Sequence, residues 1–354
     1  MNAENIWWGQ VGNSLRLLSS ITERLRDHRS AVLHMPERFP WRQRFYREID
    51  LRRAPYAMER RLKRIEWSGR GDPGKFVLET LCPLSVQADY WPGQSYGEYL
   101  GSRGNLALND YDVWITGVHK KADVVKWAEF IAQYGAAAKD VDPHAAFLIE
   151  YDGPDVTAGA VERISCQIER YDCRVFCLET AAEQSEPRLR DYRAELALSI
   201  GGRNPELCAA LLETGGRLAD DPVDAARDVL DRARDSDGRP FPQRTETELT
   251  SAVWLAAVAL LFPLIERYRI DFIERHKLEL SRFLPISNSN GDQVTEPFDL
   301  EIGALCYIIA NSRPGQYFCT PQEVNGLRLC RKIRNQLAHN KPADCADVEA
   351  VMAL

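Results

Sequence analysis

The sequence lacks the cysteine and histidine spacing of a structural or catalytic metal site. Its nine cysteines are scattered, they include no Cys-x-x-Cys pair, and none stands near a histidine at zinc-ligand spacing. There is also no His-Glu-x-x-His motif. We therefore expect buried, reduced cysteines, no metal site and no bound cofactor.

Long hydrophobic runs are also absent. The longest apolar stretch, Ala252 to Ile265, contains Pro263 and is shorter than the roughly 20 residues that cross a bilayer. The first ten residues, Met1 to Gln10, do not have the basic-then-apolar order of a signal peptide. These features predict a buried helix and a cytoplasmic protein.

The charge is negative overall but uneven along the chain. The net charge of −7 argues against a protein that coats nucleic acid without specificity. The window from Ile21 to Arg70 nevertheless holds 14 Lys and Arg against 7 Asp and Glu. Aromatic residues stand among its arginines, which is typical either of a phosphate-binding surface or of a solvated helix face.

The first two thirds of the sequence alternate short apolar runs with helical patterns, which favours an α/β region with a mostly parallel sheet and flanking helices. The predicted strands are 31–35, 111–118, 145–151 and 173–178, and the predicted helices are 6–25, 41–49 and 122–134. Two short helices, 205–212 and 222–233, form a small helical extension at about 200–234. The polar segment from Asp235 to Thr247, with Pro240 and Pro242, predicts a linker.

Beyond this linker the pattern becomes helical throughout. We expect helices at 248–279, bent or broken at Pro263, and at 296–310, 321–339 and 346–354. Four helices in about 110 residues form a bundle of ordinary size. The predicted domains are thus an α/β region over residues 1–240 and an all-α bundle over residues 245–354.

One motif stands near the end of the predicted helix 321–339. Apolar residues at spacings of three and four predict a buried stripe, after which Arg334 begins the string Arg-Asn-Gln-Leu-Ala-His, ending at His339. This Arg-Asn-x-x-Ala-His arrangement resembles the signature of HEPN domains, and Glu296, Asp299 and Glu301 form an acidic start to the preceding helix. The resemblance covers the last 110 residues or so. It implies a helical bundle, often a metal-independent ribonuclease or a nucleotide-binding module, with two motifs facing each other across a dimer.

The residue types of this motif suit RNA cleavage. An imidazole transfers protons near neutral pH, and a planar guanidinium holds phosphate oxygens with two parallel hydrogen bonds. We therefore assign proton transfer to His339, phosphate binding to Arg334, and orientation of either group to Asn335. Arg334 and His339 are five residues apart, about 140° around an ideal helix, so either the helix loosens near His339 or a dimer completes the site. Alternatively, an arginine and a histidine at this position simply cap the helix.

Two further segments invite comparison with nucleotide-binding proteins. Gly69 to Lys75 (GRGDPGK) fits the P-loop pattern, but Phe76 stands where Ser or Thr should hold magnesium, so we interpret the segment as a turn. Phe147 to Glu150 is an apolar run ending in an acid, whereas the loop from Pro36 to Pro40 has neither glycine nor lysine. The N-terminal region is thus similar to a degenerate P-loop ATPase-like domain.

Three functional hypotheses follow. The first is a HEPN-type endoribonuclease effector, of the kind found in bacterial toxins and anti-phage defence, controlled by its N-terminal region and acting as a homodimer on RNA. The second is a non-catalytic adaptor that uses the bundle to dimerise or to bind a partner ATPase or nucleic acid. The third is a nucleotide-binding enzyme that uses Lys75.

Overall fold

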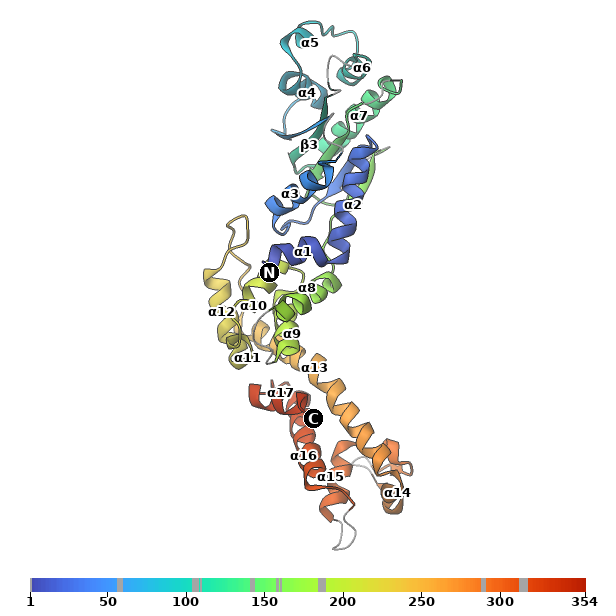
Figure 1. The fold of residues 1–354 in the computed structure, drawn as a ribbon, viewed down its shortest axis with the longest axis vertical. Coiled ribbons are helices and arrows are strands. Elements are labelled where there is room, and N and C mark those ends of the chain that lie inside the picture. Colours follow the sequence, from blue (N-terminus) through green and yellow to red (C-terminus); the bar gives the residue numbers. More distant parts are fainter. Residues whose placement is uncertain are drawn as a thin grey trace. The chain divides into compact units, whose positions relative to one another are not determined.

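The computed structural model describes residues 2–55, 60–103, 108, 110–140, 144–156, 159, 161–183, 189–287, 291–311 and 318–354. The chain forms two compact units, Asn2–Asp172 and Cys173–Leu354. Figure 1 shows an α/β first unit and a helical second unit, as the sequence predicts.

The first unit is built on a parallel sheet. Its described strands stand in the order β2-β3-β4-β1-β5, and every neighbouring pair is parallel. The strands are β1 (Ala31–His34), β2 (Arg61–Glu66), β3 (Tyr111–Val118), β4 (Phe147–Tyr151) and β5 (Glu162–Ser165). The predicted strands 31–35, 111–118 and 145–151 are confirmed as β1, β3 and β4. Because all strands run the same way, their carboxyl ends meet at one edge, where α/β proteins usually place a ligand.

Helices cover both faces of this sheet. Phe147 on one face packs against Phe130 and Tyr134 of α7, whereas Trp114 on the other packs against Phe45 and Tyr46 of α3. The helices are α1 (Ala3–Gln10), α2 (Gly12–Arg26), α3 (Arg42–Arg53), α4 (Pro73–Leu81), α5 (Leu84–Ala88), α6 (Tyr96–Ser102) and α7 (Lys121–Ala137). One helix was predicted over residues 6–25, but the extended backbone of Val11 divides it into α1 and α2.

The predicted strand at 173–178 is wrong, because this segment lies inside helix α8 (Arg170–Glu183). Cys173, Phe176 and Cys177 are buried, whereas Leu178 is exposed. That spacing is helical, and the short apolar run concealed it. The strand that completes the sheet is instead β5, in which only Ile164 is buried.

In its described residues the second unit is helical apart from the short hairpin of β6 (Ile286–Ser287) and β7 (Gln293–Val294) and one isolated bridge. Its other helices are α9 (Arg190–Gly201), α10 (Pro205–Leu212), α11 (Arg217–Asp220), α12 (Pro222–Arg232), α13 (Glu246–Arg275), α14 (Lys277–Leu280), α15 (Ile302–Asn311), α16 (Pro321–Ala338) and α17 (Cys345–Met352). Helix α13 is not broken at Pro263, which is exposed and lies inside one continuous helix.

The division between the units falls at Asp172–Cys173, which differs from the boundary near residue 240 that the sequence predicts. Helix α13 packs against α9 and α12 as well as against α16 and α17. The predicted linker also carries the buried Phe241 and a bridge between Arg234 and Pro240. Packing of α9 and α12 on α13 therefore joins the predicted helical extension to the C-terminal helices.

Within the described residues, α13 is the one helix long and apolar enough to cross a membrane by length and composition. The same properties belong to a core helix of a protein without a membrane span. Here α13 buries Leu249, Val253, Leu261 and Ile265 against its neighbours.

Candidate functional site

Helix α16, which carries the Arg-Asn-x-x-Ala-His motif, begins at a complete capping box. The Thr320 hydroxyl accepts from the Glu323 backbone N–H at 3.2 Å, and the Glu323 carboxylate accepts from the Thr320 N–H at 2.8 Å. Pro321 follows at the first helical position, where its missing N–H costs nothing. Leu327, Cys330, Ile333 and Leu337 are buried, so the predicted stripe is confirmed.

Helix α16 ends in a motif of backbone hydrogen bonds. Asn340 is left-handed, with φ of 55°; its N–H donates to the Leu337 carbonyl at 3.1 Å, and the Lys341 N–H donates to the Gln336 carbonyl at 3.0 Å. These two bonds form a Schellman cap. The indole Nε1 of Trp254 on α13 also donates to the Leu337 carbonyl, at 2.8 Å. The helix end is therefore completed without the side chains of Arg334 and His339.

The motif side chains are accessible. Asn335 and His339 are exposed, and Arg334 retains 41% of its side-chain surface. The Arg334 guanidinium lies 3.8 Å from the carboxylate of Glu301, the residue before α15, so Glu301 faces the motif. This ion pair is long and solvated, which makes its contribution to stability small.

The helix does not loosen before His339. Helix α16 is continuous through Ala338, and the His339 N–H still donates to the Asn335 carbonyl at 3.2 Å. Arg334 and His339 therefore leave the helix about 140° apart, whereas Asn335 and His339 share one side. One chain thus presents two separate parts of the expected site.

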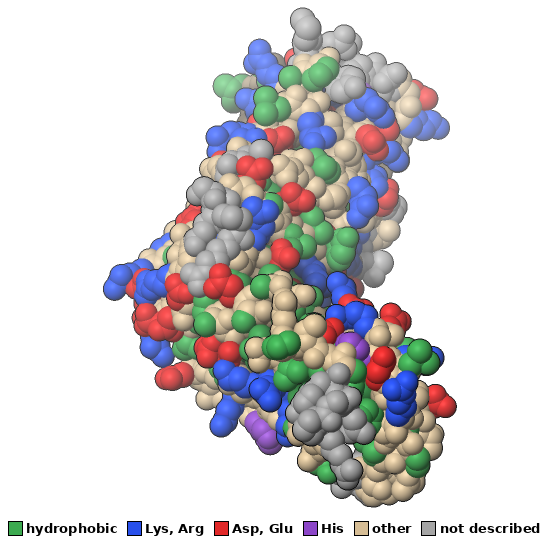
Figure 2. Space-filling model, turned by 60° about the horizontal axis from the view of Figure 1, so that its bottom comes forward, with side chains coloured by type: hydrophobic (Ala, Val, Ile, Leu, Met, Phe, Trp, Pro, Cys, Tyr) green, Lys and Arg blue, Asp and Glu red, His purple; other side chains and the backbone are tan. Residues whose placement is uncertain are grey.

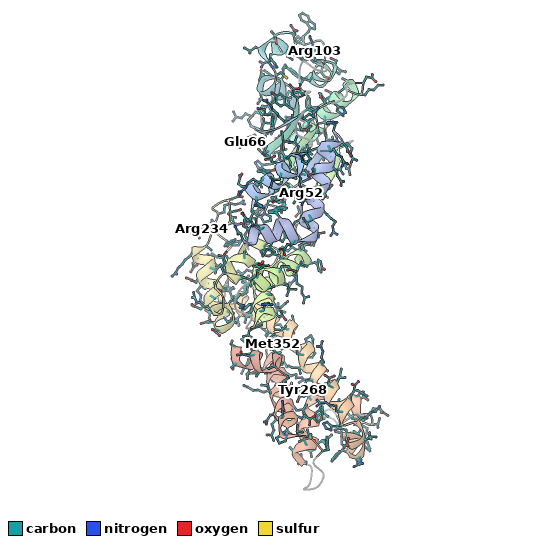
Figure 3. All side chains as sticks on the ribbon, viewed as in Figure 1. Arg52, Glu66, Arg103, Arg234, Tyr268 and Met352 are labelled. Carbon is teal, nitrogen blue, oxygen red and sulfur yellow. The ribbon has the colours of Figure 1, made fainter. Side chains whose placement is uncertain are left out.

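The position of α16 depends on a close approach to α13. A Cβ at Gly326 would lie 2.2 Å from the hydroxyl oxygen of Tyr268, a residue labelled on α13 in Figure 3. The same hydroxyl donates to the Glu323 carbonyl at 3.2 Å. Gly326 therefore allows the two helices to meet.

We expect Gly326→Ala to lower the free energy of unfolding by about 1–2 kcal/mol, because the overpacking cost exceeds the helix-propensity gain of alanine. Thermal denaturation measures the change. Gly303→Ala on α15 is the matched control, since a Cβ there meets nothing within 4 Å. Equal melting temperatures of the two variants would contradict the expected clash.

In the first unit, Gly69 to Asp72 form a bend and Pro73 to Lys75 already belong to α4, so the turn predicted over Gly69 to Lys75 is confirmed only for its first half. The Asp72 carboxylate caps α4 by accepting from the Lys75 backbone N–H at 2.9 Å, and the Lys75 ammonium lies 3.6 Å from Glu79 on the same helix. The preceding residues do form a strand, β2, but a largely exposed one. An aspartate at the N-cap occupies the helix end that a phosphate would use, so this geometry does not favour the Lys75 hypothesis.

The first unit also contains a hydrolase-like motif that the sequence analysis did not identify. Gly93 to Gly97 (GQSYG) has the Gly-x-Ser-x-Gly spacing of hydrolase nucleophiles. Ser95, however, is the N-cap of α6, and its hydroxyl accepts from the Glu98 N–H at 3.2 Å within a capping box. The serine therefore has a structural role.

Glu150, at the carboxyl end of β4, is fully engaged by other side chains. Its carboxylate accepts from Arg42 at 2.6 Å, from the Tyr46 hydroxyl at 2.6 Å and from the Trp114 indole at 2.8 Å. Burial and the neighbouring Glu150 carboxylate raise the pKa of Tyr46. An acid held in this way is not free to bind magnesium or to activate water.

The loop after β1 is filled by aromatic side chains. Phe39 is buried and packs against Trp8 and Phe45, with ring centroids 5.4 Å and 4.9 Å apart. Phosphate-binding loops instead expose backbone amides and a lysine. A cavity of about 360 Å³ lies beside this loop; Trp7, Trp8 and Asn13 line it, and the Asn13 amide donates to Asp172 at 2.6 Å.

Across the described ranges, no three His, Cys, Asp or Glu side chains lie close enough together to hold a metal ion. Cys173, Cys177 and Cys208 are buried in the second unit. Burial raises the pKa of the Cys166 thiol in the first unit.

Comparisons with known proteins add little to this geometry. No protein-family model matches the chain, and no curated protein matches it. Among solved structures, the chain is similar to the Aeropyrum pernix ORC1 protein in complex with DNA, at 13% identity and a TM-score of 0.34, over 99% of this chain and 96% of that one. A likeness of this size does not establish a shared fold or function, and the ATPase-like and HEPN-like assignments stay predictions.

Proposed function

We propose that the protein is a metal-independent endoribonuclease whose site is built from Arg334, Asn335 and His339. The supporting observation is that these side chains are accessible at a helix end that the backbone and Trp254 already complete. If these side chains only capped the helix, they would hydrogen-bond its last carbonyl groups. The HEPN-like motif supplies the chemical assignment.

In this reaction a ribose 2′-hydroxyl attacks the adjacent phosphorus and the 5′-oxygen leaves. His339 takes the hydroxyl proton or gives a proton to the leaving oxygen, Arg334 binds the non-bridging oxygens, and Asn335 orients the imidazole from the same side of α16. The products are a 2′,3′-cyclic phosphate and a 5′-hydroxyl. The atoms and protons of this reaction balance without a metal ion or another reactant.

The angle between Arg334 and His339 favours a site shared by two copies of the chain. A two-fold arrangement would set the arginine of one copy near the histidine of the other. Exposed apolar side chains of the second unit, Leu255 and Phe262 on α13 and Tyr307 on α15, offer surface for such contact. A homodimer is therefore part of the proposal.

The first unit has a control or docking role in this proposal. Its glycine-free loop is filled by Phe39, and Glu150 is held by Arg42, which does not favour ATP hydrolysis by this unit. A ribonuclease that acts in toxin or anti-phage defence needs such a silencing region. A partner ATPase would dock here, and the cytoplasm is the expected compartment.

The adaptor hypothesis shares this docking role and predicts the same dimer. We expect purified protein to cleave a single-stranded RNA in the presence of EDTA and to leave cyclic phosphate ends. Mass spectrometry of the fragments identifies those ends. Stable dimers that bind RNA or a partner without any turnover would favour the adaptor instead.

A further inference from the structure

Helix α16 carries two further arginines on the side of Asn335 and His339. Arg328, Arg331, Asn335 and His339 fall within roughly 80° around an ideal helix and extend over ~16 Å of its length. Both arginines are exposed. Together with Asn335 and His339 they form one face, which we call the arginine face (Arg328, Arg331, Asn335 and His339), and Arg334 lies about 60° around the helix beyond Arg331.

The charge on this face is not compensated locally. Residues 324–343 contain Arg328, Arg331, Lys332, Arg334 and Lys341 but no Asp or Glu. Lys332 ion-pairs with Asp347 at 2.6 Å, and Arg334 lies near Glu301. Arg328 and Arg331, in contrast, have no carboxylate within ion-pair distance among the described residues.

Many other exposed cations have carboxylate partners, although some, such as Arg61 and Arg70, also have no ion pair among the described residues. On the face drawn in Figure 2, basic and acidic side chains are interleaved over much of the molecule. Arg217 in the same unit, for example, pairs with Asp224 and Asp228. Neighbouring unpaired guanidinium groups repel one another, and a polyanion would relieve that repulsion.

One neutral group lies near the two arginines. The Cys306 thiol on α15 lies beside Arg331 and Arg328, and burial raises the pKa of this thiol despite both arginines. A protonated thiol cannot balance their charge. Both guanidinium groups therefore keep donors for an outside acceptor.

We propose that Arg328 and Arg331 bind backbone phosphates of the RNA to one side of the scissile linkage, so that the substrate is a single strand several nucleotides long. This inference rests on the proposed ribonuclease function. A single strand suits the site because it can follow one helix and can place its 2′-hydroxyl in line with the phosphorus. The two arginines bind substrate, whereas Arg334, Asn335 and His339 contact the reacting group.

The test uses the full chain and its Arg328→Ala/Arg331→Ala variant on two substrates. One is an unstructured oligoribonucleotide, and the other is a dinucleoside monophosphate, which reaches only the motif. For the oligonucleotide we expect KM to rise about tenfold per arginine, with kcat unchanged. Cleavage of the dinucleoside should stay the same. Arg282→Ala, which removes an exposed arginine outside α16, is the control and should behave as the wild type.

A non-cleavable 2′-O-methyl strand separates this inference from the proposed function. Its affinity, measured by fluorescence anisotropy against salt, should fall in the double variant, with a salt slope smaller by about 0.7 for each arginine. An unchanged affinity would overturn the proposed phosphate binding by Arg328 and Arg331 even if the wild type cleaves RNA. Equal losses on the oligonucleotide and the dinucleoside would also overturn it. Absence of cleavage by the wild type, with the affinity loss intact, would refute the nuclease alone.

Discussion

His339→Ala is expected to lower the rate of RNA cleavage by roughly 10²–10⁴-fold, because a positioned general acid or base contributes about that much. The imidazole is exposed, and the helix end is completed by the Schellman cap and by Trp254. The variant should therefore keep the stability of the wild type within about 0.5 kcal/mol. Cleavage of an oligoribonucleotide in EDTA, together with thermal denaturation, measures both effects.

Arg334→Ala should cause a loss of similar size, since it removes the bidentate donor to the phosphate oxygens. Arg334→Lys keeps the charge but not the planar fork, so it should restore only a small part of the rate. Lys341→Ala serves as a nearby control that removes an exposed cation just beyond the motif. Undiminished turnover in both His339→Ala and Arg334→Ala would remove these residues from the chemistry.

The second large effect concerns the first unit, where Glu150→Ala should lower the free energy of unfolding by about 3–5 kcal/mol. The substitution leaves the Arg42 guanidinium without this carboxylate, and it leaves the half-buried Tyr46 hydroxyl and the buried Trp114 indole without their acceptor. For a unit of this size the melting temperature should fall by roughly 10 °C. Calorimetry of the full chain, with the transition of the first unit resolved, measures the change.

Glu150→Gln provides the matched comparison, because the amide oxygen still accepts hydrogen bonds while the charge is lost. We expect a destabilisation smaller than that of Glu150→Ala, and no change in any ATP hydrolysis. A loss of ATP hydrolysis in this variant, without loss of stability, would instead show that Glu150 acts on a nucleotide. That outcome would indicate that the first unit is an active ATPase.

Local sequence signals account for the elements that were predicted correctly. Thr320, Pro321 and Glu323 indicate the start of helix α16, and a buried stripe at helical spacing indicates the helix itself. The strands β1, β3 and β4 are apolar runs of strand length, and most of their residues are buried. Strands β2 and β5 escaped prediction because edge strands carry exposed charged residues, as Arg61 and Glu162 show.

The sequence by itself determined the parallel α/β character of the first part, the helical character of the second, and the place of Arg334, Asn335 and His339 at a helix end. Each depends on residues within a few positions of one another. Only the tertiary structure decided that Trp254 completes this helix end from 83 positions away, that Glu301 faces Arg334, and that Arg42 holds Glu150 across 108 positions. It also decided that α9 and α12 pack on α13 and so move the boundary between the units. Such contacts depend on the path of the backbone between distant segments, which no local pattern records.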